Sequence, residues 1–226
     1  MKWNKEAFGR TAENLMHPSL AHLVSRLPTS ELDGQIYPPG ILVRKMTGRY
    51  NLQEIKEKVL LYPEAKTAGV TDARGQTAKI SNRQTGIVDL GDMAEPVIDL
   101  VRRVYRDEVE PFFQCKLRSM ETPQILRYSK GSFYRPHSDS DIIDRSSQRW
   151  KKSMDRDLSL LIYLDQEYEG GSLIFPNFDF QLEAQEDLLV AFPSDFRYLH
   201  GVMPVISGVR NAIVSWCALQ GSPPPQ

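Results

Sequence analysis

Cysteine is scarce in this 226-residue chain, which contains only Cys115 and Cys217. Two cysteines, each flanked by apolar residues, are too few for a disulfide framework and fit a reducing compartment. No apolar run approaches the length needed to span a bilayer, and the first residues lack the apolar core of a signal peptide. We therefore expect a cytoplasmic protein without a membrane partner.

An excess of charge of either sign is also missing. The chain has 28 basic and 29 acidic residues, for a net charge of −1. Without a global basic field, there is no electrostatic basis for holding nucleic acid, so no nucleic-acid partner is expected. We find no internal repeat, and the sequence does not indicate an oligomeric state.

The length is typical of a single β-rich domain. We expect one domain over residues 1–226, with a helical and β support region at 1–118, a catalytic core at 119–221 and a disordered tail at 222–226. The apolar spacing predicts helices over 3–27, Leu52–Leu61 and Asp92–Phe113, the last with an acidic start that would cap it.

The C-terminal half consists of short apolar runs separated by turn residues. The predicted strands include 41–46, 158–164, 173–175, 178–180, 188–192 and 202–205. Short strands at such spacing are typical of a sandwich or barrel. We therefore predict a mainly β (α+β) fold, in which a barrel is backed by the N-terminal helices.

The residues with the clearest chemical meaning are His137 and Asp139. In an extended strand, residues i and i+2 point to the same face, so this pair aims an imidazole and a carboxylate at one point. His200 would complete a set of two histidines and one carboxylate, which leaves metal positions open and suits a non-haem Fe(II) oxygenase. The other two histidines, His17 and His22, are five residues apart and do not share a helical face.

Two further acidic residues, Asp141 and Asp144, compete with Asp139 for the role of ligand. Asp141 would share the strand face but lies about 6.6 Å further along, at roughly 3.3 Å per residue. That distance is too great if His137 holds the metal, so Asp139 is preferred. Ten residues after His200, Arg210 offers a planar cation suited to a carboxylate at the bottom of a pocket.

Between Asp139 and Leu158 the chain is too polar for a core and too long for a simple hairpin loop. Loops of this length are usually functional or disordered. The stretch 140–157 has two interpretations: a lid over the metal with Trp150 as its apolar contact, or a solvated insertion.

Several blocks, in order, resemble the Fe(II)/2-oxoglutarate-dependent dioxygenases of the prolyl 4-hydroxylase-like branch. The matching blocks are Tyr128-Ser-Lys-Gly131, His137-Ser-Asp139, Leu160-Leu-Ile-Tyr-Leu-Asp165, Gly170-Gly-Ser-Leu-Ile-Phe-Pro176, His200-Gly-Val-Met-Pro-Val, Gly208-Val-Arg210 and Trp216. The resemblance covers about the C-terminal half. It implies a double-stranded β-helix, that is, a jelly-roll or cupin-like barrel.

The resemblance also implies roles for individual residues. His137, Asp139 and His200 would bind Fe(II), and Arg210 would pair with one end of 2-oxoglutarate. Tyr163 would assist Arg210, although a core tyrosine with a satisfied hydroxyl is the alternative. Tyr128 would face either the chelating end of 2-oxoglutarate or the substrate. The remaining candidates for lid or substrate contacts are Trp150, Arg83 and Trp216.

The implied reaction uses O2 and 2-oxoglutarate to hydroxylate an unactivated C–H bond with release of succinate and CO2; ascorbate would serve as a possible reductant. Because Asp139 occupies the position that related halogenases leave to a halide, hydroxylation is expected rather than halogenation. By resemblance, a prolyl or peptidyl substrate is placed ahead of a free amino acid or other small molecule. Outside this class, a non-catalytic metal-binding barrel and an interaction module on a vestigial fold remain alternatives.

Overall fold

Strand β14 (Leu158–Tyr163) shows how the sequence builds the core of this fold. All six of its residues are buried. Leu158, Leu160 and Ile162 contact one apolar cluster, whereas Leu161 and Tyr163 contact a second. Because side chains alternate along a strand, both faces of β14 are covered, which explains its nearly continuous apolar sequence.

The computed structural model describes residues 26–62, 83–144, 146–165 and 167–225, and the backbone of the short strands at 66–67, 70–71 and 77–78. The predicted helix at 3–27, with His17 and His22, lies almost entirely outside these residues, as does most of the stretch between 65 and 82.

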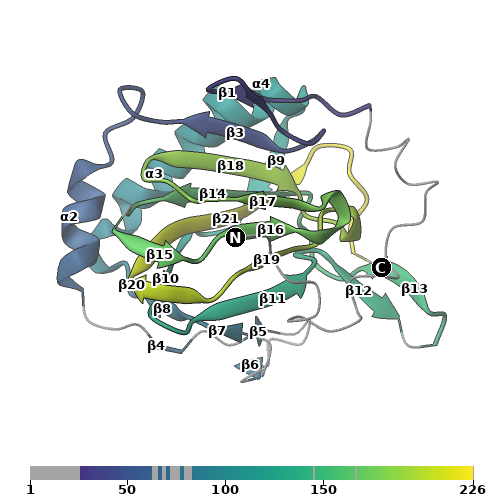
Figure 1. Ribbon diagram of the computed structural model, residues 1–226. Coiled ribbons are helices and arrows are strands. Elements are labelled where there is room, and N and C mark those ends of the chain that lie inside the picture. The colour runs from purple at the N-terminus through teal and green to yellow at the C-terminus, as the bar shows by residue number, and fades with distance from the viewer. Residues whose placement is uncertain are drawn as a thin grey trace.

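Two antiparallel sheets make up the barrel (Figure 1). The larger sheet has the order β3-β18-β14-β21-β10-β8-β4, with β9 also paired to β21. Its strands are β3 (Leu42–Lys45), β4 (Lys66–Thr67), β8 (Gly86–Val88), β9 (Leu117–Met120), β10 (Gln124–Tyr128), β14, β18 (Leu188–Pro193) and β21 (Arg210–Leu219).

The smaller sheet has the order β17-β16-β19-β11-β7. Its strands are β7 (Arg83–Gln84), β11 (Phe133–His137), β16 (Leu173–Phe175), β17 (Phe180–Leu182) and β19 (His200–Val202). Four two-stranded ribbons are β1 (Glu31–Leu32) with β2 (Gln35–Ile36), β5 (Val70–Thr71) with β6 (Thr77–Ala78), β12 (Asp141–Asp144) with β13 (Arg149–Lys152), and β15 (Tyr168–Gly170) with β20 (Val205–Gly208).

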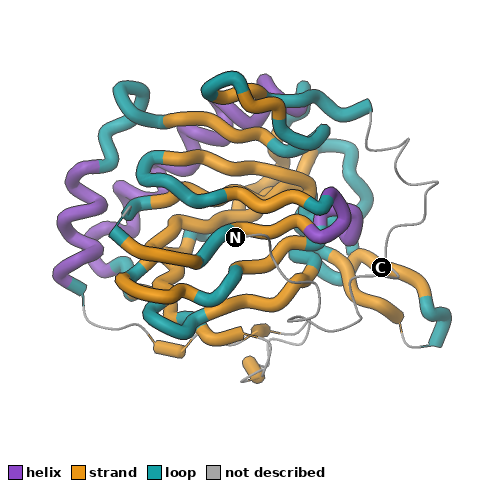
Figure 2. The backbone as a smooth tube through the Cα atoms, viewed as in Figure 1, coloured by secondary structure: helices purple, strands orange, loops and turns teal. Residues whose placement is uncertain are grey.

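Helices cover the outer face of the larger sheet (Figure 2). They are α2 (Gln53–Leu61), α3 (Ala94–Val104), the π-helical turn η4 (Tyr105–Val109) and α4 (Glu110–Phe113). Short 3-10 turns are η3 (Gly91–Met93), η5 (Pro176–Phe178) and η6 (Phe196–Tyr198). The apolar stripe of α3, including Val97, Leu100 and Val104, packs in the same cluster as the outer side chains of β14. The prediction of a mainly β barrel backed by helices is therefore confirmed.

Several local predictions need correction. The carboxylate of Asp92 does not cap the long helix; it accepts hydrogen bonds from Tyr62 and Lys58. The expected strand at 178–180 begins only at Phe180, after the turn η5, and the expected strand at 202–205 is divided between β19 and β20. The tail expected to be disordered is held at its start, because Ser222 donates to Asp157 and the Pro223 carbonyl accepts from Lys152.

The polar stretch 140–157 has features of both interpretations, because its strands are half-buried or exposed, as in a solvated insertion, whereas Met154 and Arg156 near its end line the cavity beside His137 and His200. It forms the hairpin β12–β13, which projects beyond the edge of the sheets (Figure 1). Trp150 stacks on Phe196 with ring centroids 5.3 Å apart, and Asp141 accepts a hydrogen bond from the Phe196 backbone N–H. These contacts attach the hairpin to η6, and Trp150 does not line the cavity beside His137 and His200.

Candidate active site

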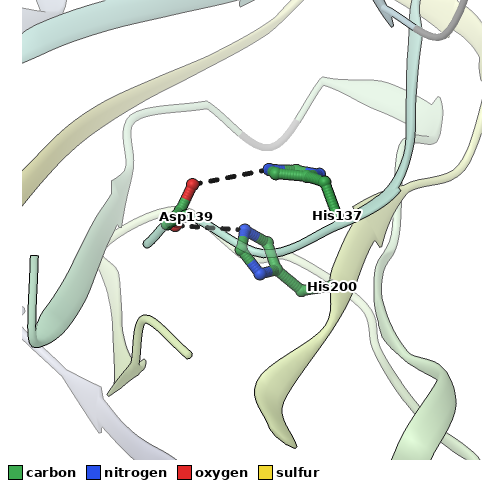
Figure 3. A group of neighbouring side chains, drawn as sticks. All are labelled: His137, Asp139 and His200. Carbon is green, nitrogen blue, oxygen red and sulfur yellow. Dashed lines mark ion pairs between the residues drawn. The ribbon is translucent and has the colours of Figure 1, made fainter. Parts of the chain in front are cut away.

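His137, Asp139 and His200 lie together inside the barrel (Figure 3). Their candidate ligand atoms all lie within 4.8 Å of one another. One Asp139 oxygen is 3.5 Å from His137 Nε2, and the other is 3.4 Å from His200 Nε2. His137 ends strand β11, so Asp139 follows the strand rather than extending it. The predicted convergence is correct, although a turn brings the carboxylate to the histidines.

Backbone carbonyls orient both imidazoles. His137 Nδ1 is 2.9 Å from the Arg135 carbonyl oxygen, and His200 Nδ1 is 3.1 Å from the Tyr198 carbonyl oxygen. In each ring, Nδ1–H donates to the carbonyl, which leaves the Nε2 lone pair directed at the common point. Burial lowers the pKa of His200 to about 4, against the opposing effect of Asp139. At neutral pH this imidazole is therefore uncharged, as a metal ligand must be.

Two serines that we did not predict support Asp139, one at its carboxylate and the other at its backbone. Ser159 donates to Asp139 at 2.7 Å, and its hydroxyl lies 2.8 Å from that of Ser194. The Ser194 carbonyl accepts from the Asp139 backbone N–H at 3.1 Å. Burial opposes ionisation of Asp139, but the adjacent histidines and the Ser159 hydroxyl outweigh it, so its pKa lies well below the usual range. A polar residue in the otherwise apolar β14 was the available sequence signal for Ser159.

Arg210 begins strand β21 and is 1% exposed. Its guanidinium carbon lies 4.8 Å from the Tyr128 ring centroid and 4.7 Å from that of Tyr163. Arg210 Nε and Nη2 and the Tyr163 hydroxyl are buried and have no hydrogen-bond partner among the described residues. A Cβ at Gly171 would come within 3.0 Å of Arg210 Cδ, and the φ of +65° at this residue also favours glycine.

A buried cation without a partner is unfavourable, because it loses hydration without gaining an opposite charge. The donor set of Arg210 and Tyr163 fits a carboxylate in this space. Burial raises the pKa of Tyr163, so its hydroxyl stays protonated and able to donate. The residues present therefore fit both groups that the resemblance implies: an iron ion among the three ligands and the carboxylate end of 2-oxoglutarate at Arg210.

A cavity of about 160 Å³ adjoins the three candidate ligands. The predicted residues Arg83, Tyr128 and Trp216 line it. Tyr134, Met154 and Arg156 also line it and were not predicted. The Tyr134 ring stacks on His137 with centroids 3.6 Å apart, which adds an aromatic cover to one ligand. Both cysteines lie outside this cavity lining, and burial raises the pKa of Cys217 to about 12, which makes it a poor nucleophile.

Comparison with known proteins agrees with the sequence motifs. Residues 123–218 match the model of the 2OG-Fe(II) oxygenase superfamily. This part of the chain is therefore similar to the proteins of that superfamily.

The curated relatives that match part of the chain are named as hydroxylases. A putative prolyl 4-hydroxylase from Acanthamoeba polyphaga mimivirus is 31% identical over 125 residues, which are 48% of this chain and 52% of the relative. A PKHD-type hydroxylase from Klebsiella pneumoniae (strain 342) is 31% identical over 110 residues, 46% of this chain and 47% of that protein. The chain thus spans about half the length of these curated relatives.

Solved structures share the fold. A prolyl-4-hydroxylase from Pseudomonas putida has a TM-score of 0.56 at 18% identity, covering 88% of this chain and 97% of that one. The 2OG complex of a viral collagen prolyl hydroxylase from Paramecium Bursaria Chlorella virus-1 has a TM-score of 0.53 at 20% identity, covering 84% and 99%. A prolyl hydroxylase from Trichoplax adhaerens, in complex with a hypoxia inducible factor oxygen degradation domain peptide fragment, has a TM-score of 0.52 at 18% identity, covering 79% and 83%. In the part of the chain that the structure describes, no helix is long and apolar enough to cross a membrane.

Proposed function

We propose that this protein is an Fe(II)- and 2-oxoglutarate-dependent oxygenase that hydroxylates an unactivated C–H bond, with a prolyl or peptidyl substrate placed first by resemblance. The observation that carries the proposal is the pairing of two features inside one barrel. Two oriented histidines and a carboxylate converge on one point, and a buried, unpaired Arg210 lies beside Tyr128, which also lines the adjoining cavity.

The overall reaction is balanced. One atom of O2 enters the new hydroxyl group of the substrate, and the other enters succinate as 2-oxoglutarate loses CO2. When bound, the iron and 2-oxoglutarate supply the oxidising power that breaks the C–H bond.

The residues of the chain hold and orient these components. His137, Asp139 and His200 would hold the iron, and a set of three protein ligands would leave positions open for the other reactants. Arg210 would neutralise one carboxylate of 2-oxoglutarate, and the Tyr163 hydroxyl would donate a hydrogen bond to it. Ser159 fixes the Asp139 carboxylate, and the apolar walls of the cavity keep bulk water away. Ascorbate is the proposed reductant that restores Fe(II) after unproductive turnover.

An anaerobic titration tests this proposal. Fe(II) and then 2-oxoglutarate are added to the protein, and the weak visible charge-transfer band of a chelated 2-oxo acid is followed. We expect the band in the wild type, its loss in Asp139→Ala, and its persistence in Arg149→Gln, which removes an exposed arginine from the projecting hairpin. Succinate release under air then identifies substrates.

The same titration separates the proposed enzyme from a non-catalytic metal-binding barrel. A metal sensor needs no carboxylate-binding arginine. If the wild type binds Fe(II) but forms no band with 2-oxoglutarate, the oxygenase proposal is wrong and the metal-binding barrel becomes the better account.

A further inference from the structure

The cavity beside the candidate metal centre contains two arginines with different surroundings. Arg83 and Arg156 both contribute to its lining. Apolar side chains form most of the remaining wall, including Ile87, Leu126 and Val214. Since polar groups in such a cavity fix the orientation of a ligand, the two cations are the first places to look for substrate recognition.

Arg156 is already neutralised. Its Nε and Nη2 donate to the two carboxylate oxygens of Glu121 at 2.6 and 2.7 Å. Its guanidinium also lies 3.9 Å from the Trp216 ring centroid. A bidentate pair combined with ring stacking holds the side chain in one orientation. Arg156 therefore gives shape to the cavity without adding net charge to it.

Arg83 is not neutralised in the same way. Within the described residues it makes no ion pair with a carboxylate, and its buried Nε has no hydrogen-bond partner. Its guanidinium carbon lies 4.7 Å from the Tyr134 ring centroid, and Tyr134 in turn stacks on His137. Tyr134 thus contacts both the Arg83 guanidinium and the candidate metal ligand His137. The cation therefore lies close to where a substrate must lie.

The difference between Arg83 and Arg156 becomes clearer when the charges at the metal centre are counted with Fe(II) and 2-oxoglutarate bound. If the proposed function holds, the two positive charges of Fe(II) and the one of Arg210 balance the carboxylate of Asp139 and the two carboxylates of 2-oxoglutarate. The Arg156–Glu121 pair is neutral as well. The charge of Arg83 is left over, and this half-buried guanidinium, whose buried Nε has no partner among the described residues, favours an anion, with a carboxylate matching its planar donors best.

We propose that Arg83 binds a carboxylate of the substrate, so that the substrate is a small carboxylic acid of the amino-acid type or the C-terminal residue of a peptide. This inference rests on the proposed oxygenase function and narrows its substrate class. A peptidyl substrate modified in the interior of a chain offers no main-chain carboxylate at this position.

Matched acids and amides test the inference. Wild type, Arg83→Gln and the control Arg149→Gln are loaded anaerobically with Fe(II) and 2-oxoglutarate. The common L-amino acids are added as free acids and as carboxamides, and so are their N-acetylglycyl dipeptides in both forms. Perturbation of the charge-transfer band reports binding without turnover, and succinate release after admission of O2 reports reaction.

We expect at least one acid to bind the wild type about 10-fold or more tightly than its amide, because a hydrogen bond to a charged group is strong in a desolvated site. Arg83→Gln should lose this preference, and Arg149→Gln should keep it. A preference for free amino acids or for dipeptide acids identifies the source of the carboxylate.

Three outcomes overturn the inference: amides bind as well as acids, no acid in the panel perturbs the band, or the acid preference survives in Arg83→Gln. Each of these requires that the wild type forms the band, and so leaves the proposed oxygenase intact. Absence of the band in the wild type is the separate failure of the proposed function.

Discussion

Two charged side chains are buried to the same extent in this protein but in opposite circumstances. Glu108, in η4, is 1% exposed and accepts hydrogen bonds from Arg44, Arg49 and Tyr50. Arg210, in the barrel, is also 1% exposed and has buried donors that find no partner in the part of the chain that the structure describes. A buried charge with all its partners stabilises the connection between elements, whereas a buried charge without them indicates a missing ligand. The burial of a charged side chain does not by itself tell a structural role from a functional one. The hydrogen-bond partners of the side chain make that distinction.

The strongest test of this contrast is Arg210→Met. Removing the cation should weaken binding of 2-oxoglutarate by about 10²- to 10³-fold, because a buried charge pair is lost. The thermal stability of the ligand-free protein should be unchanged or higher, since an unpaired buried charge is removed. The charge-transfer titration and a thermal melt measure the two effects. Wild-type affinity for 2-oxoglutarate, or a large loss of stability, would contradict our assignment of Arg210.

Glu108→Gln should show the reverse pattern. We expect the free energy of unfolding to fall by about 2 kcal/mol, at the lower end for a buried pair because Arg44 and Arg49 are half-exposed and can be hydrated. Affinity for 2-oxoglutarate should not change. Denaturant unfolding gives the stability, with the exposed Glu31→Gln as the matched control. Equal stability of the two variants would show that the Glu108 cluster is not structural.

Asp139 is an intermediate case, because its partners serve the site as well as the fold. Ser159→Ala removes the hydroxyl that donates to the carboxylate and should lower metal affinity about 10-fold, as expected for loss of a group that orients a ligand. Titration with Fe(II) under nitrogen measures the change, and Ser207→Ala, on the exposed part of β20, is the control. An unchanged metal affinity would remove Ser159 from the site.

The smallest effect is expected when a paired arginine is converted into an unpaired one. Glu121→Gln frees Arg156, whose side chain is 17% exposed while that of Glu121 is 38% exposed. The stability should change by less than about 1 kcal/mol, because the ion pair is partly solvated. Binding of carboxylic acids in the cavity should improve by less than about fivefold. Weaker binding of acids would show that Glu121 positions Arg156 rather than merely neutralising it.

The sequence predicted the parts of this protein that depend on local pattern. The alternation of buried strands such as β14 and the apolar stripe of α3 both follow from side-chain periodicity. The metal-ligand candidates were found because their motifs occur in a recognisable order. By contrast, the sequence left two interpretations of 140–157 open, because its polar composition did not reveal that Trp150 would stack on Phe196, far along the chain.

The partners of each charged side chain were also beyond the sequence. Arg83, Arg156 and Arg210 look alike in the sequence, yet Glu121 neutralises Arg156 from 35 residues away. The pairing is decided by long-range packing, which no local pattern records. Whether a charged side chain is paired or unpaired matters most for function, and only the structure shows which of the two applies.

One feature of the smaller sheet links the site to the folding of the chain. His137 and His200 are direct partners across the antiparallel pair β11–β19. Gly201 permits the close approach, since a Cβ there would come within 2.8 Å of the Tyr134 carbonyl oxygen. A slip of one residue would turn a histidine to the opposite face of the sheet. A metal ion that requires both imidazoles would therefore also select the correct strand alignment and hold the two sheet segments in register.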